Sequence, residues 1–266
     1  MLNGAAYAEV NVFLGAWALT QPRLLAMCAM LPLFNRQLLP GLLRYGICAA
    51  LGLVLVPMVM PRYAELDLGT AALLLLIAKE VFIGLVMGYL VALPFWIFEA
   101  VGFVIDNQRG ASLGATINPA TGNDSSPMGI LFNQAFMVFF LVGGGFTLML
   151  TLLYDSFRLW DLWSWSPTLR ADSIPLMLDQ LSRFMRLVLL FAAPAIVAMF
   201  LAELGLALVS RFAPQLQVFF LAMPIKSGLA LLVLVLYMSP LFEYAGDTVR
   251  DIPGILPFLD DQWRLP

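Results

Sequence analysis

The stretch KEVFIGLVMGYLVALPFWIFEAVGFVIDNQRG, residues 79–110, decides the fold class of this chain. Residues 81–98 carry no charge, and their apolar side chains do not alternate with polar ones as in a half-buried strand. In lipid, only helices and closed barrels satisfy every backbone hydrogen bond, and barrel strands show that alternation. We therefore predict a helix over residues 69–106 and an all-α fold.

One face of this helix is small and acidic. At about 100° per residue, a single stripe contains Glu80, Gly84, Gly88, Val91, Phe95, Glu99, Gly102 and Asp106. Gly84 and Gly88 form a GxxxG pair, which lets a neighbouring helix backbone approach closely, and we assign helix packing to them and to Gly102. The helix would be about 57 Å long, nearly twice a hydrocarbon core of about 30 Å. Part of it must lie outside the lipid, or it must be broken at Pro94.

The composition indicates an integral membrane or membrane-derived protein. Hydrophobic residues make up 62% of the chain and charged residues only 12%, far from the usage of soluble domains. The net charge of −3 is spread along the chain, so we expect no nucleic acid partner. The N-terminus lacks a basic region and carries Glu9, so we expect the first helix to be retained and not cleaved as a signal peptide.

The remaining apolar segments predict further helices with unusual charge positions. The helices are expected at residues 9–33, 41–60, 128–155, 181–212 and 216–243. A conventional span needs about 20 residues without charge, and of the charge-free runs only 125–154 comfortably exceeds that length. The runs that fall short are 81–98, 187–202, 212–225 and 227–242. Such helices pack against protein on the charged side or are not simple lipid-facing spans. The proline-rich tail, DIPGILPFLDDQWRLP, is expected to be irregular.

The sequence offers little for catalysis. It has no histidine, and Cys28 and Cys48 lie in apolar segments without metal-ligand spacing, so we expect no enzyme activity, metal or cofactor. An intramembrane hydrolase would have to use Asp106, Glu99 or Ser112, without a convergent base. A secondary transporter is the main alternative, but it should show repeated hydropathy and a symmetric pair of breaks, whereas the long polar loop occurs once.

Charged residues inside the apolar helices are expected to be structural. They are Lys79, Glu80, Glu99, Asp106, Glu203, Arg211 and Lys226. Residues 181–243 form a predicted two-helix hairpin, and Glu203 and Lys226 lie 11 and 12 residues from Pro214 on opposite arms. An isolated charge there would cost several kcal/mol, which favours mutual pairing. The other possibility is that each finds a separate partner, for instance on another subunit.

Several blocks of the chain together resemble a known family. They are KEVFIGLVMGYLVALPFWIFEAVGFVIDNQRG, SSPMG, GGGFTLML, YDSF and APAIVAMFLAELGLALVSRFAPQLQVFFLAMPIKSGLAL. In order and spacing, these blocks are similar to SctT, the export-gate subunit of type III secretion injectisomes, also called the YscT, HrcT or SpaR family, with FliR as its flagellar relative. The resemblance covers most of the chain, and residues 94–110 resemble the injectisome branch more than the flagellar one.

The resemblance implies a noncatalytic pore component in the bacterial inner membrane, within the secretion basal body and partly at periplasmic level. Its implied partners are SctR-like and SctS-like subunits, SctU-like and SctV-like proteins, the inner rod or needle base, and unfolded secreted proteins as cargo. Residues 1–180 would be an SctR-like helical region, and residues 181–266 an SctS-like hairpin with the tail. Because the apolar surface is large and the small-residue stripe needs a close partner, we expect the subunit to be stable only in the hetero-oligomer.

The polar loop at about 107–127 interrupts the apolar chain once. Its candidate residues are Arg109, Gly110, Ser112, Gly114, Thr116, Asn118, Pro119, Thr121, Gly122, Asn123 and Ser125. Glycines give backbone freedom, and small polar side chains bind no particular substrate strongly, which suits an obstruction in a protein-conducting pore. Asp106 and Arg109, about one turn apart, can pair at the helix end. We predict that residues 110–126 are a plug, although an exposed surface loop would have the same composition.

Overall fold

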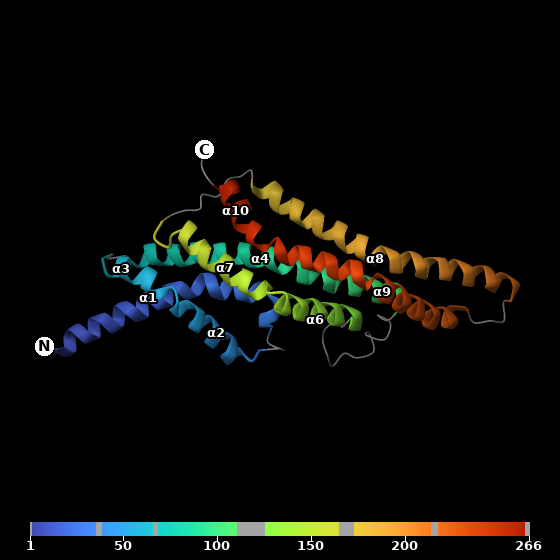
Figure 1. Cartoon of the computed structure of the whole chain (residues 1–266), viewed down its shortest axis with the longest axis horizontal. Coiled ribbons are helices and arrows are strands. Elements are labelled where there is room, and N and C mark those ends of the chain that lie inside the picture. Colours follow the sequence, from blue (N-terminus) through green and yellow to red (C-terminus); the bar gives the residue numbers. More distant parts are fainter. Residues whose placement is uncertain are drawn as a thin grey trace. The chain divides into compact units, whose positions relative to one another are not determined.

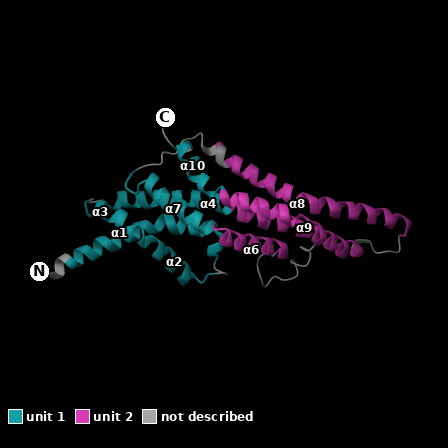
Figure 2. Cartoon of the chain, viewed as in Figure 1, with its two compact units in different colours: residues 1–92, 145–173, 251–266 teal, residues 93–144, 174–250 magenta. Residues whose placement is uncertain are grey.

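The computed structural model describes residues 2–35, 39–65, 69–110, 126–164, 173–213 and 218–263. Within these ranges every regular element is a helix, so the predicted all-α fold is confirmed. The described chain divides into two compact units, which Figure 2 shows in different colours. The family-based division at residue 180 is a different partition and stays a prediction.

Unit 1 contains residues 1–92, 145–173 and 251–266. Its elements are α1 (Leu2–Met30), η1 (Pro32–Phe34), α2 (Gly41–Leu53), α3 (Val56–Glu65), the first part of α4 (Thr70–Arg109), α7 (Gly145–Leu159), η2 (Ile252–Gly254) and α10 (Ile255–Trp263). Within this unit α1 packs against α2 and α3, and Trp17 on α1 donates its indole N–H to the Ala49 carbonyl on α2 at 2.9 Å. The helix α1 is therefore central to unit 1.

Unit 2 contains residues 93–144 and 174–250. Its elements are the rest of α4, α6 (Pro127–Val142), α8 (Ser173–Phe212) and α9 (Val218–Arg250). Phe95 on α4 packs edge to face against Phe136 on α6, with ring centroids 4.7 Å apart. Helices α8 and α9 run side by side as a hairpin (Figure 1), and Phe191 contacts Tyr244 across it at 4.5 Å.

Four helices of the described chain are long and apolar enough to cross a membrane. They are Ala6–Met30, Thr70–Arg109, Leu178–Phe212 and Phe220–Arg250. The helix α4 continues through Pro94, so the alternative of a break at that proline is not what the structure has. With 40 residues, α4 is about 60 Å long, slightly longer than predicted, and part of it must lie outside a hydrocarbon core of about 30 Å.

Two segments predicted as single helices are broken. Residues 41–60 form α2 and α3, which meet at 71°. Pro57 follows this break and has no N–H to donate to residue 53, which removes one helical hydrogen bond. The run 128–155 is divided into α6 and α7 at Gly143 and Gly144, and Gly144 has φ +78°, a conformation that favours glycine.

The expectation of an irregular tail is wrong. Residues 252–263 form η2 and α10, with Leu259 and Trp263 buried. Pro253 and Pro257 lie in the first turns of these helices, where the N–H that proline lacks has no helical partner. The Trp263 ring lies 4.9 Å from the Trp160 ring, so the tail is packed against α7 and its C-terminal end.

Candidate functional site

A fully buried ion pair lies at the centre of unit 1. The guanidinium of Arg23 on α1 donates to both carboxylate oxygens of Glu80 on α4, at 2.7 and 2.9 Å, and both side chains are inaccessible to solvent. Arg23 also donates to Ser156 Oγ at 3.0 Å and to the Trp160 carbonyl at 3.1 Å. Its remaining face lies 4.0 Å above the Phe157 ring. Three helices, α1, α4 and α7, are joined by this one side chain.

Lys79 extends the same cluster to the end of α7. Its ammonium lies 3.0 Å from Glu80 Oε1. It also donates to the carbonyls of Asp161, Leu162 and Ser164, at 3.2, 2.8 and 2.8 Å. These carbonyls follow the last turn of α7, where helical carbonyls have no intrahelical partner and a cation is favourable. The Arg62 side chain pairs with the carboxylate of Asp161 at the exposed edge.

The packing glycines of α4 have their close neighbours within the same chain. In unit 1, a Cβ on Gly84 would collide with the Arg23 carbonyl, and one on Gly88 would lie 2.8 Å from the Met27 carbonyl. In unit 2, a Cβ on Gly102 would collide with the backbone of Met128 and Gly129. The stripe therefore packs against α1 and α6, and it does not require another subunit.

A buried carboxylate in unit 2 contacts both ends of the segment 111–125. Asp106 Oδ2 accepts from Ser126 Oγ at 2.6 Å and from the Met128 N–H at 2.9 Å. Its Oδ1 is 2.6 Å from Arg109 Nη2, an ion contact without hydrogen-bond alignment. Ser126 in turn caps α6 by accepting from the Gly129 N–H at 2.8 Å. We call Asp106, Arg109, Ser126 and Met128 the neck.

The predicted ion pair in the hairpin is present. Lys226 Nζ on α9 lies 2.6 Å from Glu203 Oε2 on α8 and donates to the Gln108 carbonyl at the end of α4, at 3.3 Å. The Glu203 side chain is 50% exposed, whereas that of Lys226 is 12% exposed. Because the two charges meet within the chain, the alternative of separate partners is not what the structure has.

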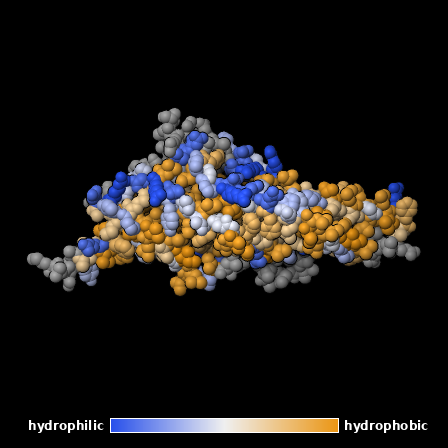
Figure 3. Space-filling model, viewed as in Figure 1, coloured by the Kyte–Doolittle hydropathy of each residue, from blue (hydrophilic) through white to orange (hydrophobic). Residues whose placement is uncertain are grey.

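Exposed apolar side chains cover much of the hairpin (Figure 3). The runs 187–202 and 227–242 are each 16 residues long; the first ends next to Glu203, and the second begins next to Lys226. In the most apolar windows, 28% of α8 and 11% of α9 is buried, against 61% of α4. Exposed members include Leu189, Leu190, Val197, Phe200, Leu201, Leu231, Leu232, Val235 and Leu236. At about 1.5 Å per residue each run is about 24 Å long, shorter than a hydrocarbon core of about 30 Å.

Other predicted site residues lie apart from the neck or outside the described residues. Glu99 accepts a hydrogen bond from the Asn133 amide at 2.7 Å, and Arg211 is exposed in the last turn of α8. Gly110 has φ 84°, in the region that favours glycine. The candidate plug residues outside the described chain are Ser112, Gly114, Thr116, Asn118, Pro119, Thr121, Gly122, Asn123 and Ser125.

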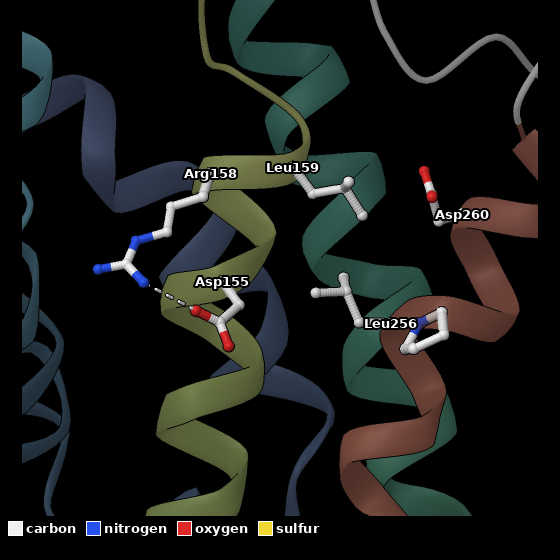
Figure 4. Close-up of a pocket in the computed structure, with 6 residues that line it drawn as sticks. Asp155, Arg158, Leu159, Leu256 and Asp260 are labelled. Carbon is white, nitrogen blue, oxygen red and sulfur yellow. Dashed lines mark hydrogen bonds and ion pairs between the residues drawn. The ribbon is translucent and has the colours of Figure 1, made fainter.

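A groove in unit 1 runs between α7 and α10 (Figure 4). Its volume is about 430 Å³, and it is lined by Asp155, Arg158, Leu159, Leu256, Pro257 and Asp260. Asp155 and Arg158 pair with each other at 3.3 Å on the α7 wall. These residues do not combine a nucleophile with a general base. Among the described residues, no group of three or more His, Cys, Asp or Glu could hold a metal ion.

Comparison with known sequences identifies the family. The profile of the family described as "Bacterial export proteins, family 1" matches residues 14–252. The chain belongs to this family. The export protein is 42% identical over 232 residues to the Yop proteins translocation protein T of Yersinia pestis, covering 86% of this chain and 88% of the relative.

Two further relatives of the export protein agree with the expected family. The surface presentation of antigens protein SpaR of Salmonella typhimurium is 33% identical over 236 residues, covering 89% of this chain and 88% of the relative. The flagellar biosynthetic protein FliR of Bacillus subtilis is 27% identical over 229 residues, covering 85% and 87%. The resemblance to the SctT and FliR family is thus confirmed.

Most of the residues that contact the charged side chains described above could not be identified from the sequence. Arg23 was a lone charge between the charge-free runs 10–22 and 24–35, which is a signal for a buried partner but does not identify it. Ser126 precedes Pro127 at the start of an apolar helix, and that pattern predicts an N-cap. The backbone acceptors of Gln108, Trp160 and Leu162 carry no side-chain signal at all.

Proposed function

We propose that this export protein is a noncatalytic subunit of a type III secretion export gate. It forms part of the protein-conducting channel across the bacterial inner membrane, and residues 110–126 form the plug of that channel. The observation that carries the proposal is the relationship to the Yop translocation protein T and SpaR over most of both chains. The four apolar helices and the largely uncovered hairpin support a subunit that functions within a membrane assembly.

The hairpin supports assembly with other helical subunits. Both helices are long enough to cross a membrane, but their charge-free runs of about 24 Å end at charged residues, so a span of about 30 Å would place a charge within the hydrocarbon core. Neighbouring protein helices can cover such a surface without requiring a charge-free stretch as long as the hydrocarbon core. The proposed neighbours are SctR-like and SctS-like subunits, with SctU-like and SctV-like proteins and the inner rod or needle base beyond them. Part of the subunit would then lie at periplasmic level.

The dependence on partners can be tested by extracting the chain with and without them. We expect the subunit expressed alone to aggregate or be degraded, because large apolar side chains on α8 and α9 remain uncovered. Co-expression with the SctR-like and SctS-like subunits should give a single species in mild detergent. A monodisperse monomer of the isolated chain would contradict the proposal.

The neck supports the plug hypothesis. A loop that obstructs a pore needs fixed ends and a variable middle, and the Asp106 carboxylate contacts Arg109 before the loop and Ser126 after it. The carboxylate also accepts from the Met128 N–H at the start of α6, where a negative charge is favourable. The loop composition, with glycine and small polar residues, suits contact with unfolded cargo of any sequence.

Deleting residues 112–122 from the assembled complex tests the plug. The deletion leaves the neck intact, so we expect normal assembly and a higher ion conductance across a planar bilayer. The matched control replaces residues 112–122 with the same number of Gly and Ser residues, which keeps the length and should preserve most of the seal. Unchanged conductance after the deletion would contradict the plug hypothesis, as would finding residues 110–126 on the outer wall of the complex.

A further inference from the structure

The ammonium of Lys226 is the point at which three helices of unit 2 meet. Lys226 lies on α9, its ion-pair partner Glu203 on α8, and its second acceptor, the Gln108 carbonyl, in the last turn of α4. The distances to these two partners are 2.6 and 3.3 Å. A displacement of α9 relative to α4 must therefore lengthen or break a hydrogen bond to the end of α4.

The two members of the ion pair differ in their access to water. Glu203 is half exposed, so its carboxylate can be solvated when the pair opens. Lys226 is mostly buried, and its charge depends on protein partners. The Gln108 carbonyl is one of the last carbonyls of α4, which have no intrahelical partner and carry partial negative charge. The ammonium thus supplies a hydrogen-bond donor and a positive charge to the C-terminal end of α4.

The end of α4 that Lys226 contacts also provides two of the neck residues. Asp106 and Arg109 lie in the same last turn as Gln108. One turn earlier, Gly102 is in close backbone contact with Met128 and Gly129 at the start of α6. If the last turn of α4 unwinds, the Asp106 carboxylate loses its fixed position against Ser126 and the Met128 N–H.

We propose that Lys226 couples the α8/α9 hairpin to the neck. In the resting arrangement, Glu203 pairs with the ammonium and the ammonium donates to the end of α4. The hydrogen bonds of Asp106 within the neck are then intact. When α9 shifts against α8 or α4, the ammonium leaves the Gln108 carbonyl, and the hydrogen bonds from Ser126 and Met128 to Asp106 are weakened. The inference rests on the proposed plug for its role in secretion, but the coupling itself is a property of described residues and can be measured at the neck.

Amide hydrogen exchange in the assembled complex tests the coupling. The readout is the exchange rate of the last turn of α4, residues 106–109, and of the first turn of α6, residues 128–130. Lys226→Met should raise both rates about tenfold, because it removes a hydrogen bond from a charged donor. Glu203→Gln should raise them about threefold, because the ammonium keeps the Gln108 carbonyl but loses its charged anchor.

The double variant separates coupling from general destabilisation. If Glu203 acts only through Lys226, Lys226→Met with Glu203→Gln should exchange no faster than Lys226→Met alone. Lys226→Arg keeps the charge and should stay within about twofold of the unmodified protein. The matched control is Arg211→Met, which removes an exposed cation from the same hairpin and should change neither rate. If Lys226→Met does not assemble, Lys226→Gln replaces it, with the same expected non-additivity.

Two results would overturn the coupling. One is unchanged exchange at residues 106–109 and 128–130 when Lys226 loses its charge. The other is a double variant whose effect is the product of the two single effects. Both results are independent of the plug, because the conductance of the 112–122 deletion depends on the loop and not on Lys226. The plug hypothesis and the coupling can therefore fail separately.

Discussion

The ion pairs of the two units use the same chemistry in different surroundings. In unit 1, Arg23 and Glu80 are wholly buried and have additional partners on α7. In unit 2, Lys226 meets a carboxylate that is half exposed, and its second partner is a single carbonyl. Breaking the first pair leaves a charge without water, whereas breaking the second leaves a carboxylate that water can solvate. The first cluster therefore fixes helices in place, and the second permits movement.

The largest expected effect comes from removing one partner of the buried pair. We expect Glu80→Ala to destabilise unit 1 by about 3 to 5 kcal/mol, because Arg23 would remain buried without its counter-charge. Assembly of the complex should be lost or strongly reduced, as measured by the yield of the detergent-extracted complex. The control is the double variant Arg23→Met with Glu80→Leu, which removes both charges. It should give at least half of the yield of the unmodified complex. Equal yields for the single and double variants would contradict the role assigned to the pair.

A smaller effect is expected where α4 touches α1 through glycine. Gly84→Ala should cost about 1 to 3 kcal/mol, because its Cβ would overlap the Arg23 carbonyl, which cannot move without shifting α1. The measurement is the midpoint of thermal unfolding of the complex. Gly254→Ala is the matched control: that glycine is exposed, and a Cβ there would meet nothing within 4 Å, so it should change stability by less than about 0.5 kcal/mol. Equal effects of the two substitutions would show that α4 does not pack as described.

The smallest effect is expected from exchanging the charges of the half-exposed pair. Each single reversal, Glu203→Lys or Lys226→Glu, should reduce secretion, because like charges would face each other 2.6 Å apart. The double reversal should restore more secretion than either single variant. It should stay below the unmodified level, because the new carboxylate would face the Gln108 carbonyl at the negative end of α4. Full restoration would argue against the contact with α4, and no restoration would argue against the pair.

The sequence predicted those features that depend on local pattern. Residues 81–98 can only be helical in an apolar setting, and α4 is one continuous helix. The Glu203–Lys226 pair could be predicted because both residues are nearly equally far in sequence from Pro214, where the sequence predicts a turn. Asp106 and Arg109 are three residues apart on one helix, which fixes their distance. In each case a short range of sequence determines the geometry.

Two of the three features that the sequence did not predict depend on distant parts of the chain. Arg23 and Glu80 are 57 residues apart, with no turn that relates their positions. The tail was expected to be irregular because of its prolines, but Trp263 packs on Trp160 and stabilises α10. The break at Gly143 and Gly144 lies in the longest charge-free run, where hydropathy alone favours an uninterrupted helix. Packing over long sequence distances decided the first two cases, whereas the third depends on the local conformation of Gly144.

The hydrogen bond from Arg23 to the Trp160 carbonyl also sets a waiting time during biosynthesis. The two residues are 137 positions apart, and at about 5 to 20 residues per second the ribosome needs about 7 to 27 s to reach the second after the first. Glu80 follows Arg23 by 57 positions, a delay of about 3 to 11 s. Until then the guanidinium is charged within a nascent helix that has no other charge between residues 10 and 30. The order of synthesis therefore sets the shortest time for which the guanidinium depends on water or an insertion factor before its partners in the chain exist.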